Sequence, residues 1–311
     1  MSKTILSCVC LLIGLLAVRS DTIVVGSFDD TFHQAESACV VNVLQQRGYN
    51  ATLLVGNHTI SYERLWSGDI DFLPSAWLPS GHASFVQGAG KQLNEDYVEL
   101  GVTSEEGVFF WVASPAAVQA GVHSIDDLAD PAKTPAGFMP EVYGAPADSG
   151  LSYAAVSIVA ELNARRRAAD ARSMQFVYQP SLVDNVRNMA ANMSGGVPFV
   201  AALWSPFYGY ERFVLQGNMT RLAPGAIGAP RFGLPNRGTT LTTPRLLRSG
   251  RVDRATLAVL AGMFVGNAAL SAMDEDINGG GLTPLAAARA NQALPQNAYW
   301  LDVYHNTTTQ L

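Results

Sequence analysis

Two tryptophans stand where their side chains could bind a cation. Each is followed two residues later by proline, in Trp77-Leu78-Pro79 and Trp204-Ser205-Pro206, and each comes just past a predicted strand. Ligands of open α/β sheets bind at strand ends, and ring faces attract quaternary ammonium groups with about 0.5–2 kcal/mol per contact. We therefore expect two walls of an aromatic cage, whose indoles face each other across a gap wide enough for a methylated cation. The alternative is core packing, which is our interpretation of Trp66, Trp111 and Trp300.

The loop before the first predicted helix, residues 27–31, could receive the tail of such a ligand. Its backbone N–H groups, with a helix N-terminus behind them, suit the carboxylate of a betaine. Asp29 and Asp30 would repel a carboxylate, however, and attract a choline-like cation. They could instead cap the helix. The turn from Asp148 to Ser152 offers a second set of backbone N–H groups for a carboxylate. Because the aspartates and these N–H groups favour different tails, the sequence predicts the ammonium head group of the ligand better than its tail.

Enzymatic chemistry finds little support in the sequence. The histidines are scattered, with neither the His-x-x-x-His nor the Cys/His spacing of a zinc site. They are His33, His58, His82, His123 and His305. There is no Gly-x-Ser-x-Gly elbow, and the glycine-rich stretches 88–91 and 279–281 lack the spacing or context of a phosphate loop. We expect no enzyme, no metal and no cofactor.

The elements that must position these residues alternate between strands and helices. Short β-branched runs predict strands at 22–26, 51–55, 69–72, 108–113, 176–178 and 199–203. Amphipathic stretches predict helices at 33–47, 61–67, 151–167, 182–192, 253–267 and 284–291, with a short capped helix at 124–128. Repeated βαβ units imply a mainly parallel sheet flanked by helices, so the predicted fold class is α/β.

The composition favours an exported, soluble monomer, peripheral at most to a membrane. Residues 1–20 have the early lysine and short apolar run of a cleaved signal peptide, the alternative being an uncleaved anchor. Without Lys3 and Arg19 the chain has 18 basic against 26 acidic residues, which disfavours nucleic acid as a partner. Cys39 is then the single cysteine, so no internal disulfide can form.

Five Asn-x-Ser/Thr sites bear on the compartment. They lie at Asn50, Asn57, Asn192, Asn218 and Asn306. In a eukaryotic secretory route they could carry glycans, which would make the protein an extracellular glycoprotein. In a bacterial periplasm they would have no meaning.

Further stretches accompany the two Trp-x-Pro motifs. They are Arg47-Gly48-Tyr49, Ser67-Gly68-Asp69-Ile70-Asp71 before Ala76-Trp77, Ser124-Ile125-Asp126-Asp127-Leu128, Val142-Tyr143-Gly144 before Gly150, Phe207-Tyr208 after the second motif, and Ala287-Ala288 ahead of Trp300-Leu301. Taken together, they resemble the substrate-binding proteins of the glycine betaine/proline betaine/choline class of ABC importers. The likeness spans most of the chain after residue 20, and no single motif would suffice alone.

The resemblance implies a periplasmic-binding-protein-like (Venus flytrap) fold, in which two α/β lobes close on a ligand. Lobe 1 would comprise residues 21–112 and 216–311, and lobe 2 residues 113–215. Trp77 would offer a ring from lobe 1 and Trp204 from lobe 2. Tyr208 stands where the family usually has a further aromatic, and Phe28 replaces the family's tryptophan after the first strand with a weaker ring face. The candidate ligand-binding residues are Trp77, Trp204, Tyr208, Phe28, Ser27, Asp29, Tyr143 and Pro79.

The implied function is capture of a small quaternary-ammonium compatible solute such as glycine betaine or choline, with an ABC permease as partner if the source is bacterial. Two alternatives are open. One is a secreted hydrolase on the same fold, since fold does not fix function and carboxylates such as Glu36, Asp71 and Glu141 could pair in space. The other is an interaction protein whose pocket has lost its ligand.

Overall fold

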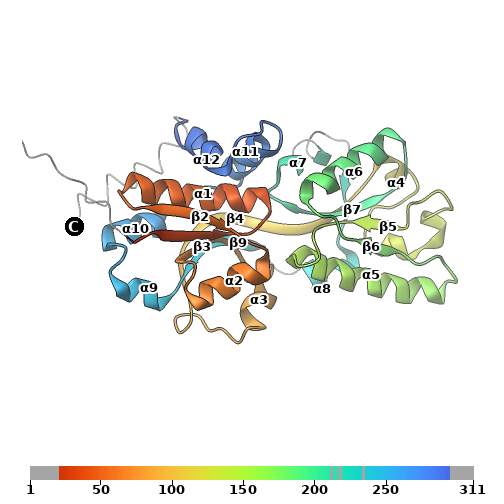
Figure 1. Ribbon diagram of the computed structural model, residues 1–311. Helices are drawn as coiled ribbons and strands as arrows, with labels where there is room; N and C mark the ends of the chain where they lie inside the picture. The colour runs from red at the N-terminus through yellow and green to blue at the C-terminus, as the bar shows by residue number, and fades with distance from the viewer. Residues whose placement is uncertain (1–20, 211–212, 215, 217–218, 233–234, 295–311) are drawn as a thin grey trace, which may run out of the picture.

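The computed structural model describes residues 21–294 except 211–212, 215, 217–218 and 233–234. The predicted signal peptide, Trp300 and the sites at Asn218 and Asn306 lie outside the described residues. The described chain alternates strands and helices in an α/β arrangement, which confirms the predicted fold class (Figure 1).

Nine strands form the sheet, most of them at or next to the predicted positions. They are β1 (Ile23–Ser27), β2 (Ala51–Val55), β3 (Phe72–Leu78), β4 (Val98–Ala113), β5 (Glu141–Tyr143), β6 (Gln175–Val177), β7 (Val200–Ser205), β8 (Thr220–Arg221) and β9 (Asn236–Thr242). The strands predicted at 22–26, 51–55, 108–113, 176–178 and 199–203 overlap β1, β2, β4, β6 and β7, whereas the strand predicted at 69–72 shares only Phe72 with β3, which continues to Leu78.

Helices surround the sheet, and many begin at a capping side chain. They are α1 (Thr31–Gln46), α2 (His58–Ser67), α3 (Ala83–Gln87), α4 (Pro115–Gln119), α5 (Gly150–Ala168), α6 (Leu182–Ser194), α7 (Tyr208–Tyr210), α8 (Gly225–Phe232), α9 (Pro244–Ser249), α10 (Arg254–Gly262), α11 (Asn267–Asn278) and α12 (Pro284–Gln292), with 3-10 turns η1 (Asp126–Ala129) and η2 (Pro131–Lys133). Asn57, Ser149 and Ser181 each accept a backbone N–H in the first turn of the helix that follows, as N-cap residues do.

The strands lie in the order β2-β1-β3-β9-β4-β7-β5-β6, with β8 beside β4. β1 is parallel to β2 and β3, and β5 is parallel to β6 and β7, so each end of the sheet consists of βαβ units as predicted. β9, which was not predicted, and β4, of which only residues 108–113 were predicted, are antiparallel to their neighbours. The parallel strands β1, β2 and β3 present their carboxyl ends at one edge, where the site lies.

The long strand β4 joins two halves of the molecule that lie side by side in Figure 1. Up to Gly107 it pairs with β9, and from Val108 to Ala113 it pairs with β7. We call the part built on β1, β2, β3 and β9 the first half, and the part built on β5, β6, β7 and β8 the second half. β8 pairs with the end of β4 and α8 packs on α5 and η1, after which β9 returns to the first half.

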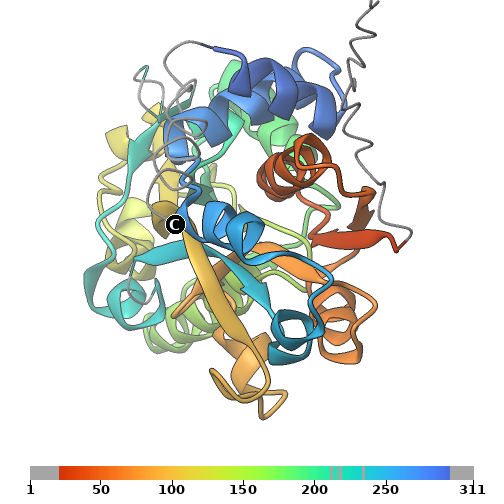
Figure 2. The same ribbon diagram turned by 90° about the vertical axis from the view of Figure 1, so that its left-hand side faces the viewer.

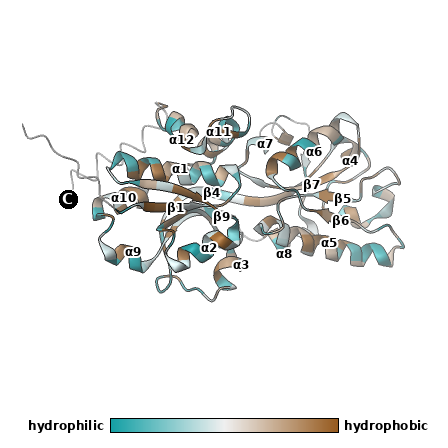
Figure 3. Cartoon of the chain, in the orientation of Figure 1, coloured by the Kyte–Doolittle hydropathy of each residue, from teal (hydrophilic) through white to brown (hydrophobic). Residues whose placement is uncertain are grey.

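Helices cover both faces of the sheet in each half. In the first half α1, α11 and α12 lie on one face and α2 and α3 on the other (Figures 1 and 2). Hydrophobic residues are concentrated in the strands between these layers (Figure 3). The core of the second half also includes Phe32 and Trp77 of the first half, so the two halves share apolar contacts.

The helix predicted over 253–267 ends earlier than predicted, and a second helix, which was not predicted, follows it. α10 ends at Gly262 and α11 begins at Asn267, and the two are bent by 93° across the break at residues 263–266, in which Gly266 has a φ of +78°. The apolar residues between the two helices continue the helical pattern in the sequence. For this reason neither the break nor α11 was predicted. Within the described residues no single helix is long and apolar enough to cross a bilayer; α10 and α11 pass that test only as a bent pair.

Candidate ligand-binding site

Trp77 lies near the carboxyl end of β3, just before the cis peptide bond Leu78–Pro79. Its indole lies over the backbone of Gly107, where an added Cβ would come within 3.2 Å of three ring carbons. It also stacks on Phe109, with ring centroids 5.8 Å apart and 22° between the planes. Its backbone N–H donates to Nδ1 of His82 at 3.1 Å. These contacts hold the indole at the junction of the two halves.

Trp204 reaches the same place from the second half. It lies in β7 directly opposite Phe109 of β4, just before the cis peptide bond Ser205–Pro206, and is only 4% exposed. Its buried Nε1 has no hydrogen-bond partner among the residues that the structure describes. Because an unpaired buried donor is unfavourable, this N–H is suited to a polar atom of a ligand.

Phe32 of α1 occupies the space between the two indoles. Its ring centroid lies 5.6 Å from that of Trp77 and 5.9 Å from that of Trp204. The sequence predicted an open gap here, whereas the structure fills it with a third ring. The cavity left beside it measures about 20 Å³, which is enough for about one water molecule. A methylated ammonium can enter only when Phe32 or one half of the molecule moves.

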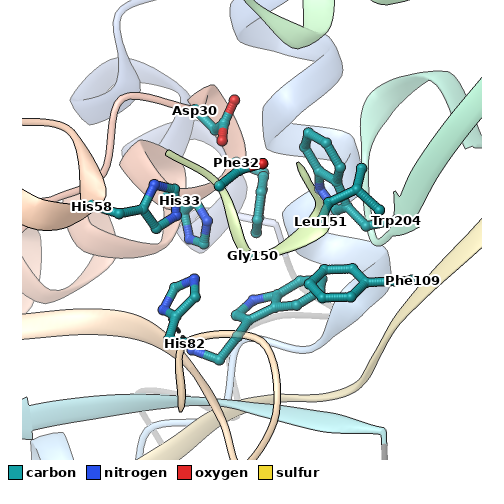
Figure 4. Close-up of a pocket in the computed structure, with 11 residues that line it drawn as sticks. Asp30, Phe32, His33, His58, His82, Phe109, Gly150, Leu151 and Trp204 are labelled. Atoms are coloured by element: carbon teal, nitrogen blue, oxygen red, sulfur yellow. Dashed lines mark hydrogen bonds between the residues drawn. The ribbon is translucent and has the colours of Figure 1, made fainter. Parts of the chain in front are cut away.

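Both halves contribute to the wall of this cavity, and aromatic and imidazole rings supply most of it (Figure 4). The lining residues are Asp30, Phe32, His33, His58, Trp77, His82, Phe109, Ser149, Gly150, Leu151 and Trp204. Ser149, Gly150 and Leu151 belong to the predicted turn at 148–152 and to the start of α5.

Three of the histidines that look scattered in the sequence meet at this cavity. His33 lies on α1, His58 begins α2 and His82 follows β3, and a ring nitrogen of each lies within 4.8 Å of the others. Each follows one of the parallel strands β1, β2 and β3, which explains their meeting. The signal in the sequence was a histidine after each of three consecutive predicted strands, rather than a short spacing.

Burial keeps these imidazoles uncharged at neutral pH. It lowers the pKa of His58 to about 3, and it lowers the pKa of His33 and His82 well below the ordinary value, with a smaller effect from the neighbouring imidazoles. Neutral imidazole can donate from one nitrogen and accept, or coordinate a metal, with the other.

Asp30 brings a carboxyl group to the cavity. It is the N-cap residue of α1, but its side chain accepts no backbone N–H there, so it does not act as the helix cap that the sequence allowed. Burial, together with the nearby carboxyl groups of Asp29, Asp274 and Asp148, raises the pKa of Asp30 to about 8. A cation in the cavity would therefore favour ionisation of Asp30.

Asp274 of α11 links the same region to the second half. It accepts hydrogen bonds from Thr31 Oγ1 at 2.5 Å and from the backbone N–H of Tyr208 at 3.0 Å, and burial raises its pKa to about 6. Tyr208 lies at the start of α7 and lines a separate groove together with Ser205, Tyr210 and Glu275.

Of the eight candidate residues, the structure places Trp77 and Trp204 on the cavity and the other six elsewhere. Phe28 is fully buried and stacks on His58, with centroids 4.5 Å apart, and Ser27 Oγ donates to the carbonyl of Phe28. Asp29 and Pro79 are exposed, and Tyr143 is half-buried in β5. For Tyr208 and these five residues, contact with a ligand stays a prediction.

Gly150 sets how closely the halves approach at the cavity. A Cβ at this position would lie 2.0 Å from the carbonyl oxygen of Gly81 and 3.4 Å from the ring of Phe109. Gly150→Ala should therefore hold the halves apart and weaken ligand binding about tenfold, equivalent to about 1.4 kcal/mol, while each half stays folded. Calorimetric titration and small-angle X-ray scattering would measure affinity and compactness. Gly137→Ala is the matched control, because an added Cβ there meets nothing within 4 Å. An unchanged affinity in Gly150→Ala would contradict this account of the interface.

Comparisons with known proteins agree with this arrangement. The family model described as the substrate binding domain of ABC-type glycine betaine transport systems (OpuAC) matches residues 21–291. No curated protein matches this chain.

Solved structures with related folds cover nearly the whole chain. Lactococcal OpuAC with glycine betaine has a TM-score of 0.71 at 18% identity, covering 91% of this chain and 99% of its own. An ABC-transporter choline-binding protein with choline has a TM-score of 0.72 at 16% identity, covering 90% and 91%. The glycine betaine/L-proline-binding protein ProX from Borrelia burgdorferi has a TM-score of 0.73 at 16% identity, covering 91% and 96%.

At these identities the structures establish a shared periplasmic-binding-protein-like fold, and the family model identifies the lineage. Because that model matches residues 21–291, this chain belongs to the family of substrate-binding domains of ABC-type glycine betaine transport systems.

Proposed function

We propose that this protein captures a small quaternary-ammonium solute, such as glycine betaine or choline, in the cavity between its halves. The observation that carries the proposal is that Trp77 and Trp204, from different halves, line one buried cavity together with Phe32 and Phe109. Membership of the family, and relatives described with bound glycine betaine and choline, support the same class of ligand.

The rings and Asp30 suit a methylated ammonium group. Such a group has no N–H to donate, so ring faces are its best neutral partners, with about 0.5–2 kcal/mol per contact. An ionised Asp30 adds Coulomb attraction that a low-polarity pocket strengthens. The unmethylated amines corresponding to these ligands stay strongly hydrated and would lose hydrogen bonds to water on entering this wall.

A carboxylate tail would find donors on the other side of the cavity. The first turn of α5 lines the cavity at Gly150 and Leu151, and we infer that their backbone N–H groups would receive the carboxylate; the N–H of Ser149 already donates to the carbonyl of Pro146. Nε1 of Trp204 is buried without a partner in the described chain. His82 accepts the Trp77 N–H at Nδ1, which leaves the proton of the neutral ring on Nε2 as a further donor.

Entry of the ligand requires the halves to separate, so we propose that they act as two lobes that close on it. β4 passes through both and is the natural place for bending, with β8 and α8 moving with the second half. Bound ligand would favour the closed state by its higher affinity for it. The protein is proposed to be a monomer.

The cellular setting follows from the family. We propose export directed by residues 1–20, action in the periplasm or outside the cell, and delivery of the solute to an ABC permease. A eukaryotic source would allow glycans at exposed sequons such as Asn50. We propose no catalytic step, in keeping with a family of transport proteins.

Titration calorimetry of the purified protein with glycine betaine, choline, proline betaine and dimethylsulfoniopropionate tests the proposal. We expect saturable binding of at least one of the four. Glycine and ethanolamine, the unmethylated counterparts of glycine betaine and choline, should give at least about tenfold weaker binding, because they lose the ring contacts. Silence for all four ligands would contradict the proposal and favour an interaction protein without a ligand, and turnover of choline esters would favour the hydrolase.

A further inference from the structure

The three histidines at the cavity have the arrangement of a metal site. The ring centroids of His33 and His58 lie 5.7 Å apart, those of His33 and His82 5.7 Å, and those of His58 and His82 4.8 Å. Three imidazoles bound to one Zn²⁺ at about 2.0–2.1 Å would have ring centres roughly 5 Å apart. Figure 4 shows the three rings gathered around a common space at one end of the cavity.

The partners of these rings leave one nitrogen of each available. Nδ1 of His33 lies 2.6 Å from Ser75 Oγ, and that hydroxyl is in turn hydrogen-bonded to the buried Glu36. Such a chain of partners behind the ring fixes the tautomer of metal-binding histidines. Nδ1 of His58 is buried and has no hydrogen-bond partner in the described chain. An uncharged imidazole with an orphaned nitrogen, held beside two others, is suited to coordinate a cation.

His82 must change its tautomer to bind a metal ion. Its Nδ1 accepts the Trp77 N–H and lies 3.1 Å from the hydroxyl of Tyr62. When Nε2 binds a metal, the proton must sit on Nδ1 and be donated to Tyr62, so the bond to Trp77 is lost. One neutral hydrogen bond is a small loss compared with a metal–nitrogen bond in a buried site.

The surroundings favour a bound metal that keeps one open position. Phe28 packs within 4.5–4.8 Å of all three rings and closes one side of the cluster. The same three histidines line the cavity on their other side, next to the carboxyl group of Asp30. Three neutral ligands leave the charge of a divalent ion to be balanced, and two buried acids are available in the first half: Asp30, which lines the same cavity, and Glu36 of α1.

We propose that His33, His58 and His82 bind one transition-metal ion, with Zn²⁺ as the best fit, and that its remaining position faces the cavity. Three histidines with an open fourth position are a recurrent zinc arrangement, and imidazole also suits Cu²⁺, Ni²⁺ and Co²⁺. All three histidines belong to the first half, so the site can form without closure of the halves. Its open position lies in the same cavity as the proposed solute, and a metal on Nε2 of His82 would replace the donor proposed above for a carboxylate tail.

The test is a Zn²⁺ titration of protein freed of metal by dialysis against a chelator. We expect one equivalent to bind with a dissociation constant in the micromolar range or tighter, and to raise the unfolding temperature, because the ion binds the folded state. Co²⁺ in place of Zn²⁺ should give visible absorption bands of a nitrogen-ligated, low-coordination site. His58→Gln and His33→Gln each remove one of the three ligands and should lower the affinity at least about 100-fold, since loss of a mere hydrogen-bond partner of a ligand already costs about 10–100-fold.

His123→Gln is the matched control, because this histidine is exposed on the second half. Unfolding curves measured without metal will show whether each variant is folded. If one of the two histidine variants does not fold, the other still provides the test. Absence of Zn²⁺ uptake by the wild type would overturn the proposal. So would equal uptake by both ligand variants, or loss of uptake in His123→Gln, because either result places the metal elsewhere. Choline titrations made in chelator show separately whether the solute proposal stands.

Discussion

Replacing Trp77 or Trp204 with alanine should weaken binding of choline or glycine betaine at least about tenfold, which corresponds to about 1.4 kcal/mol. Each substitution removes a ring from one wall of a cavity to which both tryptophans contribute. The effect should fall on affinity and be seen by titration calorimetry. Trp204→Phe should recover part of the loss, since it restores an aromatic face and leaves only the indole N–H missing.

Stability must be separated from binding in these variants, because both indoles are nearly fully buried. Truncating a buried tryptophan costs about 3–5 kcal/mol of unfolding free energy, so thermal unfolding should accompany each titration. Trp66→Ala is the matched control: this indole belongs to the first half, lies next to Tyr62 and Tyr97 and does not line the cavity. Equal loss of affinity in Trp66→Ala, or none in Trp77→Ala and Trp204→Ala, would contradict an aromatic cage.

Choline should bind more tightly as the pH rises from 6.5 to 8.5. Asp30 has a pKa of about 8 in the unliganded protein, because burial raises it and Asp29, Asp274 and Asp148 add repulsion. A cation binds the ionised form better, so below that pKa binding must release a proton. If choline binds only when Asp30 is ionised, its affinity falls about tenfold for each pH unit below the pKa of Asp30. We therefore expect the affinity for choline to rise roughly tenfold or more between pH 6.5 and 8.5.

Glycine betaine provides the internal control for this pH effect. Its carboxylate is repelled by ionised Asp30, so its affinity should rise less with pH than that of choline, or should fall. Asp30→Asn should flatten the pH dependence for choline, and chelator in all samples removes any contribution from metal. A choline affinity independent of pH in the wild type, or an unaltered pH dependence in Asp30→Asn, would show that Asp30 does not face the cation.

The alternation of strands and helices could be predicted because it depends on local patterns. Strands buried on both faces, such as β1 and β7, read as short apolar runs, and caps such as Ser149 mark the helix starts. β9 and the first part of β4 were not predicted. They are rich in threonine, glycine and charged residues, and they owe their place in the sheet to long-range pairing rather than to local hydrophobicity.

The part of the site that depends on local sequence patterns could also be predicted. Trp77 and Trp204 lie at the carboxyl ends of β3 and β7, and strand ends of an α/β sheet converge, so their meeting follows from the pattern. The position of Phe32 between them depends on where α1 begins and on how the halves pack, which no local pattern encodes. The histidines were missed because 25 and 24 residues separate them in sequence, while the parallel strands bring them together.

The most direct test of the binding site is a crystal structure of the protein grown with saturating glycine betaine. The account predicts the methylated nitrogen within contact of the rings of Trp77 and Trp204, with Phe32 moved out of its place between them. A ligand bound elsewhere, or indoles still packed on Phe32 with no ligand beside them, would contradict it.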